Sequence, residues 1–183
     1  MGGIRTTVGR RTRGVAFTAL AATTFVACNG SSSTSDGTTP AGEPIVTEVG
    51  PADALTALVR WQVDETEPVL DEDGEPVLPV MYVVSETGGT IDVGVQAAVV
   101  EQTVDDAVVR FADERAEAID DELEDEPVKD DGVLLMVAEL PDAAPSVSLA
   151  VVRYRNVEEN EALDIEVTAG PTGVDVMATP IPS

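Results

Sequence analysis

The sequence predicts one mainly β domain with the architecture of a β-sandwich and one short helix at about residues 114–124. Short apolar segments of strand length recur through residues 43–183, and several of them alternate apolar and polar residues with a period of two. Turn residues, chiefly glycine, proline and aspartate, separate these segments. The β-branched apolar content favours strands, and about 140 residues are enough to enclose a single core.

Eight segments are expected to form strands. In residues 163–168, LDIEVT, apolar and polar residues alternate, so one face of the strand should be buried and the other exposed to solvent. Residues 91–95 alternate in the same way. Residues 147–152 are apolar at most positions, which favours a central strand buried on both faces. The remaining expected strands are 55–63, 80–85, 108–111, 133–140 and 174–176.

Turn signals separate these strands. Gly88-Gly89 predicts a turn after the strand at 80–85. Residues 170–173, GPTG, predict a hairpin turn before the last strand. A small repeat, EPVL at 67–70 and again at 75–78, flanks DEDG and suggests a hairpin or an ordered loop. The proline in each arm confines the repeat to a sheet edge or a loop.

Residues 105–124 allow two interpretations. Val108, Ala112, Ala116, Ile119 and Leu123 fit one face of a helix. A hairpin at 103–108 leading into a strand fits equally well. We favour a strand to Phe111 followed by a helix over 114–124, with Asp113 as its N-cap.

The first 27 residues have the pattern of an export signal. Four arginines and no acid occupy residues 5–13, and the uncharged run 15–27 is too short to span a bilayer as a helix. The run ends in FVAC at 25–28, which resembles the lipobox of prokaryotic lipoproteins. The resemblance implies that Cys28 is lipidated, as with palmitate, and becomes the first residue of a membrane-anchored, extracytoplasmic chain. Arg10-Arg11 leaves twin-arginine export open beside the general route.

A tether is expected between this anchor and the domain. Residues 29–42 consist of Asn, Gly, Ser, Thr, Asp and Pro with a single Ala, so they bury too little apolar surface to fold. The predicted organisation is therefore a signal peptide at 1–27, a lipidated cysteine and tether at 28–42, and an acidic domain at 43–183.

The charge balance excludes several classes of partner. Six basic and 35 acidic residues follow Cys28, a net charge of −29. Such a surface repels nucleic-acid phosphates and anionic lipid headgroups, so membrane contact should be made only through the lipid anchor. The chain has no His and a single Cys, which excludes the common zinc sites and an internal disulfide. Acid excess is also typical of proteins that work in high salt.

Asp71, Asp73 and Glu75 are the candidate metal ligands. Clustered carboxylates suit Ca²⁺, but the spacing departs from the EF-hand pattern because Gly74 directly follows Asp73. A solvated acidic turn is the simpler interpretation. No other cofactor is expected.

Five residues form the candidate binding set: Arg60, Trp61, Arg153, Tyr154 and Arg155. Arginines beside aromatic residues are unusual in a domain this acidic, and they suggest a site for an anion or a partner protein. Ion pairs to neighbouring carboxylates are the competing interpretation.

No catalytic motif is recognised, and no residue is assigned a catalytic role. Without His, and with the only Cys consumed by lipid, the usual nucleophile–base pairs are missing. We therefore expect a non-catalytic binding or scaffolding domain at the cell surface, acting on an extracytoplasmic protein or small ligand. A carboxylate-dependent extracellular hydrolase and a Ca²⁺-stabilised adhesion module are the alternatives.

Overall fold

The computed structural model describes residues 47–171 and 173–182, and over this range the chain is mainly β, as the sequence predicts. The predicted lipidation site Cys28, the export signal and the tether lie outside the described residues. In chain order the elements are α1 (Pro51–Glu65), β1 (Val69–Leu70), β2 (Pro76–Val77), β3 (Val80–Ser85), α2 (Val93–Thr103), β4 (Val108–Ala112), α3 (Arg115–Ala118), a 3₁₀ turn (Lys129–Asp131), β5 (Val133–Val137), β6 (Ser146–Tyr154), β7 (Asn160–Gly170) and β8 (Gly173–Pro180).

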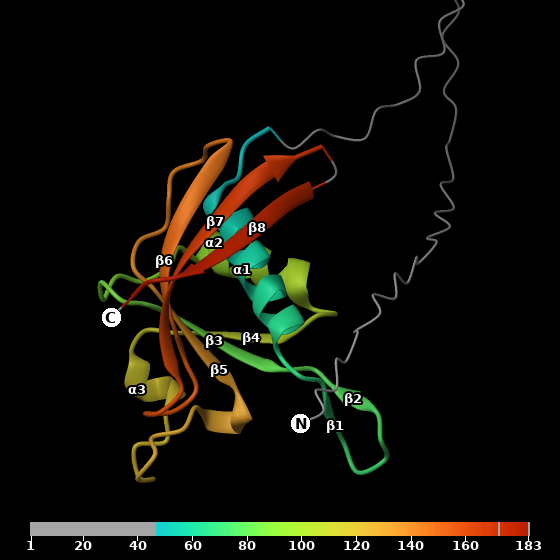
Figure 1. Cartoon of the computed structure of the whole chain (residues 1–183), viewed down its shortest axis with the longest axis vertical. Coiled ribbons are helices and arrows are strands. Elements are labelled where there is room, and N and C mark those ends of the chain that lie inside the picture. Colours follow the sequence, from blue (N-terminus) through green and yellow to red (C-terminus); the bar gives the residue numbers. More distant parts are fainter. Residues whose placement is uncertain (1–46, 172, 183) are drawn as a thin grey trace, which may run out of the picture. The chain divides into compact units, whose positions relative to one another are not determined.

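A six-stranded mixed sheet forms the centre of the fold, in the order β4-β3-β5-β6-β7-β8. β3 pairs in parallel with both β4 and β5, and the chain then runs antiparallel from β5 to β8. The expected β7–β8 turn is confirmed, and so is the hairpin of the EPVL repeat, which forms β1 and β2. The hairpin projects from the body of the domain (Figure 1).

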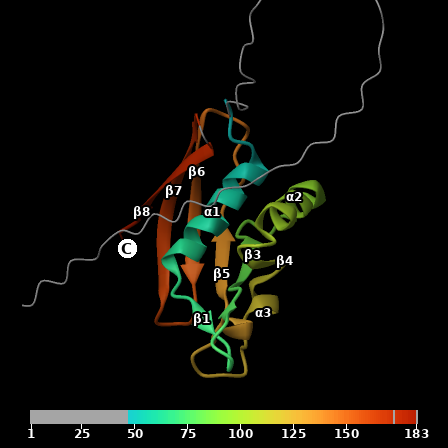
Figure 2. The same ribbon diagram turned by 90° about the vertical axis from the view of Figure 1, so that its right-hand side faces the viewer.

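Two layers enclose the main core. Helices α1 and α2 lie against one face of the sheet (Figure 2). Leu55 and Leu58 of α1 are fully buried in the same cluster as strand residues such as Leu149 and Ile165. Within the described residues, the opposite face is covered only over β3, β4, β5 and the end of β6, by α3 and the segment that follows it. There Tyr82, Leu134 and Tyr154 pack with Ala118, Ile119 and Val128.

The prediction of a strand at 55–63 was wrong, because this run lies within α1. An unbroken apolar run does not distinguish a buried strand from a buried helix. The helix start carries its own signals. Pro51 occupies the first turn, and Asp53 Oδ2 accepts a hydrogen bond from the Gly50 N–H at 3.1 Å.

The strand predicted at 91–95 was also wrong, since α2 begins at Val93. Asp92 caps this helix by accepting hydrogen bonds from Gly94 N at 2.8 Å and Val95 N at 3.3 Å. Three alternating apolar residues are too short a pattern to outweigh an aspartate cap and the good helix formers at 96–98, QAA. The sequence predicted one short helix, whereas the described residues also contain these two longer ones.

Two further predictions are corrected in extent. The strand predicted at 108–111 is confirmed as β4, which extends one residue further, to Ala112. A short helix follows as predicted, but it ends at Ala118 instead of residue 124, and its N-cap is Glu114 instead of Asp113. Ile119 has an extended backbone and forms an isolated antiparallel bridge with Val128. The segment after α3 therefore continues across the face of the sheet as an extended chain. The central position of β6 is confirmed, but its residues alternate between buried and exposed, because no described segment covers its second face over Ser146–Ala150.

Candidate functional site

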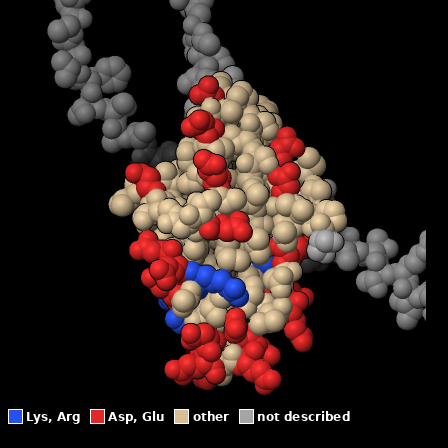
Figure 3. Space-filling model, turned by 90° about the vertical axis from the view of Figure 1, so that its left-hand side faces the viewer, with Lys and Arg blue, Asp and Glu red and all other residues tan. Residues whose placement is uncertain are grey.

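The basic residues of the described chain are almost all paired. Four arginines form ion pairs: Arg60 with Asp106, Arg110 with Asp130, Arg115 with Glu126 and Arg153 with Glu161. Lys129 donates from Nζ to the Glu117 carbonyl at 2.8 Å. Among the described residues, Arg155 is the one basic residue whose side chain has neither an ion pair nor a hydrogen bond. Figure 3 shows how acidic side chains dominate one face of the domain, with the basic ones confined to a small area.

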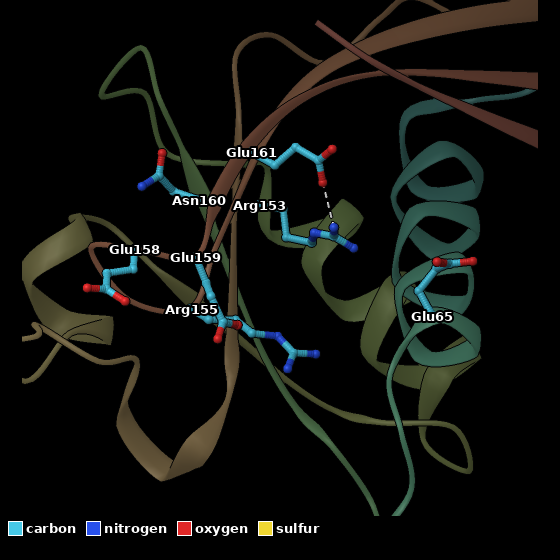
Figure 4. A pocket seen from close by; sticks show the side chains of 7 residues that line it. All are labelled: Glu65, Arg153, Arg155, Glu158, Glu159, Asn160 and Glu161. Carbon is cyan, nitrogen blue, oxygen red and sulfur yellow. Dashed lines mark hydrogen bonds and ion pairs between the residues drawn. The ribbon is translucent and has the colours of Figure 1, made fainter. Parts of the chain in front are cut away.

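Arg155 lines an open pocket of about 420 Å³ where β6 ends and β7 begins. The other lining residues are Glu65, Arg153, Glu158, Glu159, Asn160 and Glu161. Figure 4 shows the guanidinium groups of Arg153 and Arg155 directed toward the side on which Glu65 of α1 lies. Arg153 Nη2 donates to Glu161 Oε2 at 2.5 Å, which leaves the guanidinium of Arg155 available to a ligand.

The β6–β7 connection fixes this geometry. Arg153 faces Glu161 across the two strands, and the Arg155 N–H donates to the Glu159 carbonyl at 2.9 Å. Asn156 Oδ1 accepts from the N–H groups of Glu158 and Glu159 at 2.9 and 2.8 Å, which closes the turn. Because side chains two residues apart share a face of a strand, both arginines project on the side of α1.

A second pocket of about 540 Å³ shares Glu65 and Arg155 with the first. It extends to apolar side chains of the β1–β2 hairpin, Val69, Val77 and Leu78. These hairpin residues are unusually exposed for their type, Val69 at 61% and Val77 at 49%. An exposed apolar surface beside an unpaired cation suits a ligand with both an apolar and an ionic part.

The predicted binding set is only partly brought together. Arg153 lies over the ring of Trp61, with its guanidinium carbon 5.8 Å from the ring centroid, close to Arg155. Arg60 points elsewhere and ties α1 to the end of α2, donating to Asp106 Oδ2 and the Gln102 carbonyl at 2.9 and 2.6 Å. Tyr154 is buried on the opposite face of the sheet.

A second cluster, formed by Tyr82, Arg110 and Asp130, was not predicted from the sequence. The Tyr82 hydroxyl donates to Asp130 at 2.9 Å, and Arg110 bonds both groups. Hydrogen bonds from Tyr82 and Arg110 lower the pKa of Asp130, whereas burial and the bond to Asp130 raise the pKa of Tyr82. Its members come from separate strands and a loop, so no spacing in the sequence signals it.

The metal candidates lie in the turn of the β1–β2 hairpin. Asp71 Oδ1 accepts hydrogen bonds from the N–H groups of Asp73 and Glu75, both at 2.9 Å, so this carboxylate closes the turn. Within residues 47–171 and 173–182 no group of three or more acidic or thiol side chains is placed to hold a metal ion. Binding of Ca²⁺ stays a prediction.

No protein family, curated protein or solved structure was found to match this chain. The helices described here are also too short or too polar for any of them to cross a bilayer. The function is therefore argued from the pockets themselves.

Proposed function

We propose that the chain is a lipid-anchored, extracytoplasmic binding domain, and that the pocket around Arg155 takes a short zwitterionic peptide with an apolar side chain. The observation that carries this proposal is Arg155, unpaired among the described residues of a strongly acidic domain and facing open space. An arginine guanidinium recognises a carboxylate through two parallel N–H donors, so the ligand carboxylate is assigned to Arg155.

The glutamates of the pocket indicate which second charged group the ligand carries. Of the four glutamates that line it, only Glu161 has an ion-pair partner in the described chain. Glu65 and Glu159 leave the pocket negative overall, which favours an ammonium group in the same ligand and disfavours a simple anion. A zwitterion offers a carboxylate to Arg155 and an ammonium group to the glutamates. Because its net charge is zero, the acidic domain does not repel it as a whole.

The apolar part of the ligand is assigned to the hairpin. Val69 and Leu78 line the adjoining pocket within the same opening as Arg155. A leucine-sized side chain lying there would remove apolar surface of both partners from water, at about 25 cal/mol per Å². Polar groups then fix orientation and the apolar contact adds affinity, which is the usual division in small-ligand sites.

Calorimetric titration with the dipeptide Gly-Leu tests the ligand class. We expect Gly-Leu to bind, its C-terminal amide and its N-acetyl form to bind at least about tenfold more weakly, and Gly-Gly to be weakened as well. Arg155→Gln should abolish binding, whereas Arg60→Gln, outside the pocket, should leave it intact. Equal binding by the amide, or by the Arg155→Gln variant, would contradict the proposal.

Membrane attachment is tested separately at Cys28. Mass spectrometry should find acyl chains on this residue as the first of the exported chain, and Cys28→Ser should release the protein from the envelope fraction. Dual acylation is needed for stable anchoring, so loss of the attachment site should be sufficient for release. A variant that still fractionates with the envelope would remove the anchor from the proposal without affecting the pocket.

A further inference from the structure

Helix α2 exposes an apolar stripe that no other described part of the chain covers. Val93, Ala97, Val100 and Val104 recur at helical spacing and all are exposed, Val93 at 72% and Val100 at 43%. The stripe borders a shallow groove that Val109 and Phe111 of β4 complete. Among the residues that the structure describes, Glu101 is the only charged one that lines this groove, in a chain of which 25% is charged.

The neighbouring strand β4 is an open edge of the sheet. It pairs only with β3, in parallel. The Val108 N–H donates to the Pro79 carbonyl at 2.9 Å, so Val108 and every second residue after it turn their backbone groups toward β3. Val109 and Phe111 therefore direct their N–H and C=O groups outward, beside the apolar stripe.

We infer that this surface joins two copies of the chain about a twofold axis through Arg110, with β4 paired antiparallel to its copy. In this register Val109 lies opposite Phe111 of the partner, and each of the two equivalent pairs exchanges two backbone hydrogen bonds. The two sheets become one continuous sheet, and the exposed stripes of the two α2 helices meet over the join. A twofold contact of this kind is self-complementary and closed.

The charges favour a second copy as the occupant. Two domains that each carry excess acid repel one another, so they can associate only where that excess is absent. Arg110, the residue at the axis, does not oppose its copy with a free charge, because its guanidinium turns back over the Tyr82 ring and pairs with Asp130. Both partners thus bring a largely apolar surface, with Glu101 as the one charged side chain among the described residues that line the groove, beside an unpaired strand edge.

Salt dependence distinguishes this contact from an electrostatic one. Screening weakens the repulsion between two acidic domains but leaves apolar contacts and backbone hydrogen bonds, so the dimer should become more stable as salt rises. Light scattering and sedimentation of the purified protein over a range of concentrations should show a shift from the mass of one chain toward twice that mass. A monomer at every concentration and salt level would overturn the inference and leave the surface to another partner.

Two matched variants locate the interface. Val100→Lys places a charge in the stripe and should weaken the dimer about tenfold or more, as is common when a charge enters a buried apolar contact. Val157→Lys alters a valine of similar exposure, 51% against 43% for Val100, in the β6–β7 turn and should have no effect on the dimer. Thermal melting checks that both variants fold. Equal effects of the two substitutions would overturn this surface.

A cysteine at the axis tests the register. Directly opposite residues that are not hydrogen bonded lie about 4.5 Å apart at Cα, within the range that a disulfide spans. Arg110→Cys in a Cys28→Ser background, which has no other thiol, should give a covalent dimer on mild oxidation. The same background with Met177→Cys, an exposed residue on β8, should not. A non-covalent dimer that fails to cross-link through residue 110 would overturn the β4 pairing.

Discussion

At the scale of single residues, each arginine of the described chain makes a different set of contacts. Arg110 organises Asp130 and Tyr82 on one face of the sheet, and Arg115 lies over the Tyr154 ring at 4.5 Å. Arg60 links two helices, and Arg153 holds Glu161 across a strand pair. Arg155 is the exception, and for this reason it marks the candidate ligand site.

Asp130 should make stability depend on acid pH. Its pKa is lowered in the folded state by the bonds from Tyr82 and Arg110, so its contribution to stability is present above the ordinary carboxyl pKa of about 4 and is lost as the pH falls through the folded value. Asp130→Asn should therefore lower the melting temperature at pH 7 and have little effect near pH 2. The positive φ of 57° suits asparagine. Asp131→Asn, next in the chain, is the control.

Gly132 permits a close backbone crossing. A Cβ atom at this position would lie 2.8 Å from the Val80 carbonyl oxygen and 3.1 Å from that of Lys129. Gly132→Ala should cost about 1–3 kcal/mol, typical of overpacking that forces backbone to move. Gly89→Ala, whose nearest neighbour atom is 4.0 Å away, should be close to neutral in the same chemical denaturation series.

At the scale of elements, one sheet face and two helices supply the main core. β6 contributes Val147, Leu149 and Val151 to it, while the alternate residues point to water. Helix α1 buries Leu55, Leu58 and Val59 against the strands. The second face is covered only where α3 and its following segment lie, so the stability of the domain rests chiefly on the α1–sheet contact.

Leu149→Ala tests the importance of this contact. Leu149 is fully buried in the main core, and truncation should lower the free energy of unfolding by about 3 kcal/mol through lost burial and a residual cavity. Met177→Ala on β8 removes a side chain that is 59% exposed and should change stability by less than about 0.5 kcal/mol. Similar losses for the two variants in urea unfolding would contradict the assigned core.

At the scale of the whole molecule, acidic repulsion is the dominant electrostatic feature. Four ion pairs in the described residues neutralise only a small part of the 35 acidic side chains of the chain. The acids that remain repel one another over distances comparable to the Debye length, which opposes the compact state.

The melting temperature should therefore rise as sodium chloride increases from dilute to about 1 M, because screening relieves this repulsion. An unchanged melting temperature would mean that the charges are compensated locally. Millimolar CaCl₂, compared with NaCl of matched ionic strength, tests the metal prediction for Asp71, Asp73 and Glu75. A shift that occurs only with Ca²⁺ would support a specific site.

The strands whose signals were local could be predicted from the sequence. β7 alternates over residues 163–168, β8 follows a clear turn, and β1 and β2 repeat one motif around an acidic turn. The two helices α1 and α2 were missed for a physical reason. Their apolar runs fit either secondary structure, and the decisive information lies in the capping residues Asp53 and Asp92.

The sequence by itself determined the composition-level properties: a mainly β chain, the excess of acid, and few cations of which two flank Tyr154. The tertiary structure decided which of those basic side chains are available to a ligand. Pairing depends on acidic neighbours such as Glu161 and Asp130, which only the folded chain brings close. It also decided that β4 is a free edge beside an uncovered α2. Strand order and helix packing are long-range properties, and no local pattern of residues specifies them.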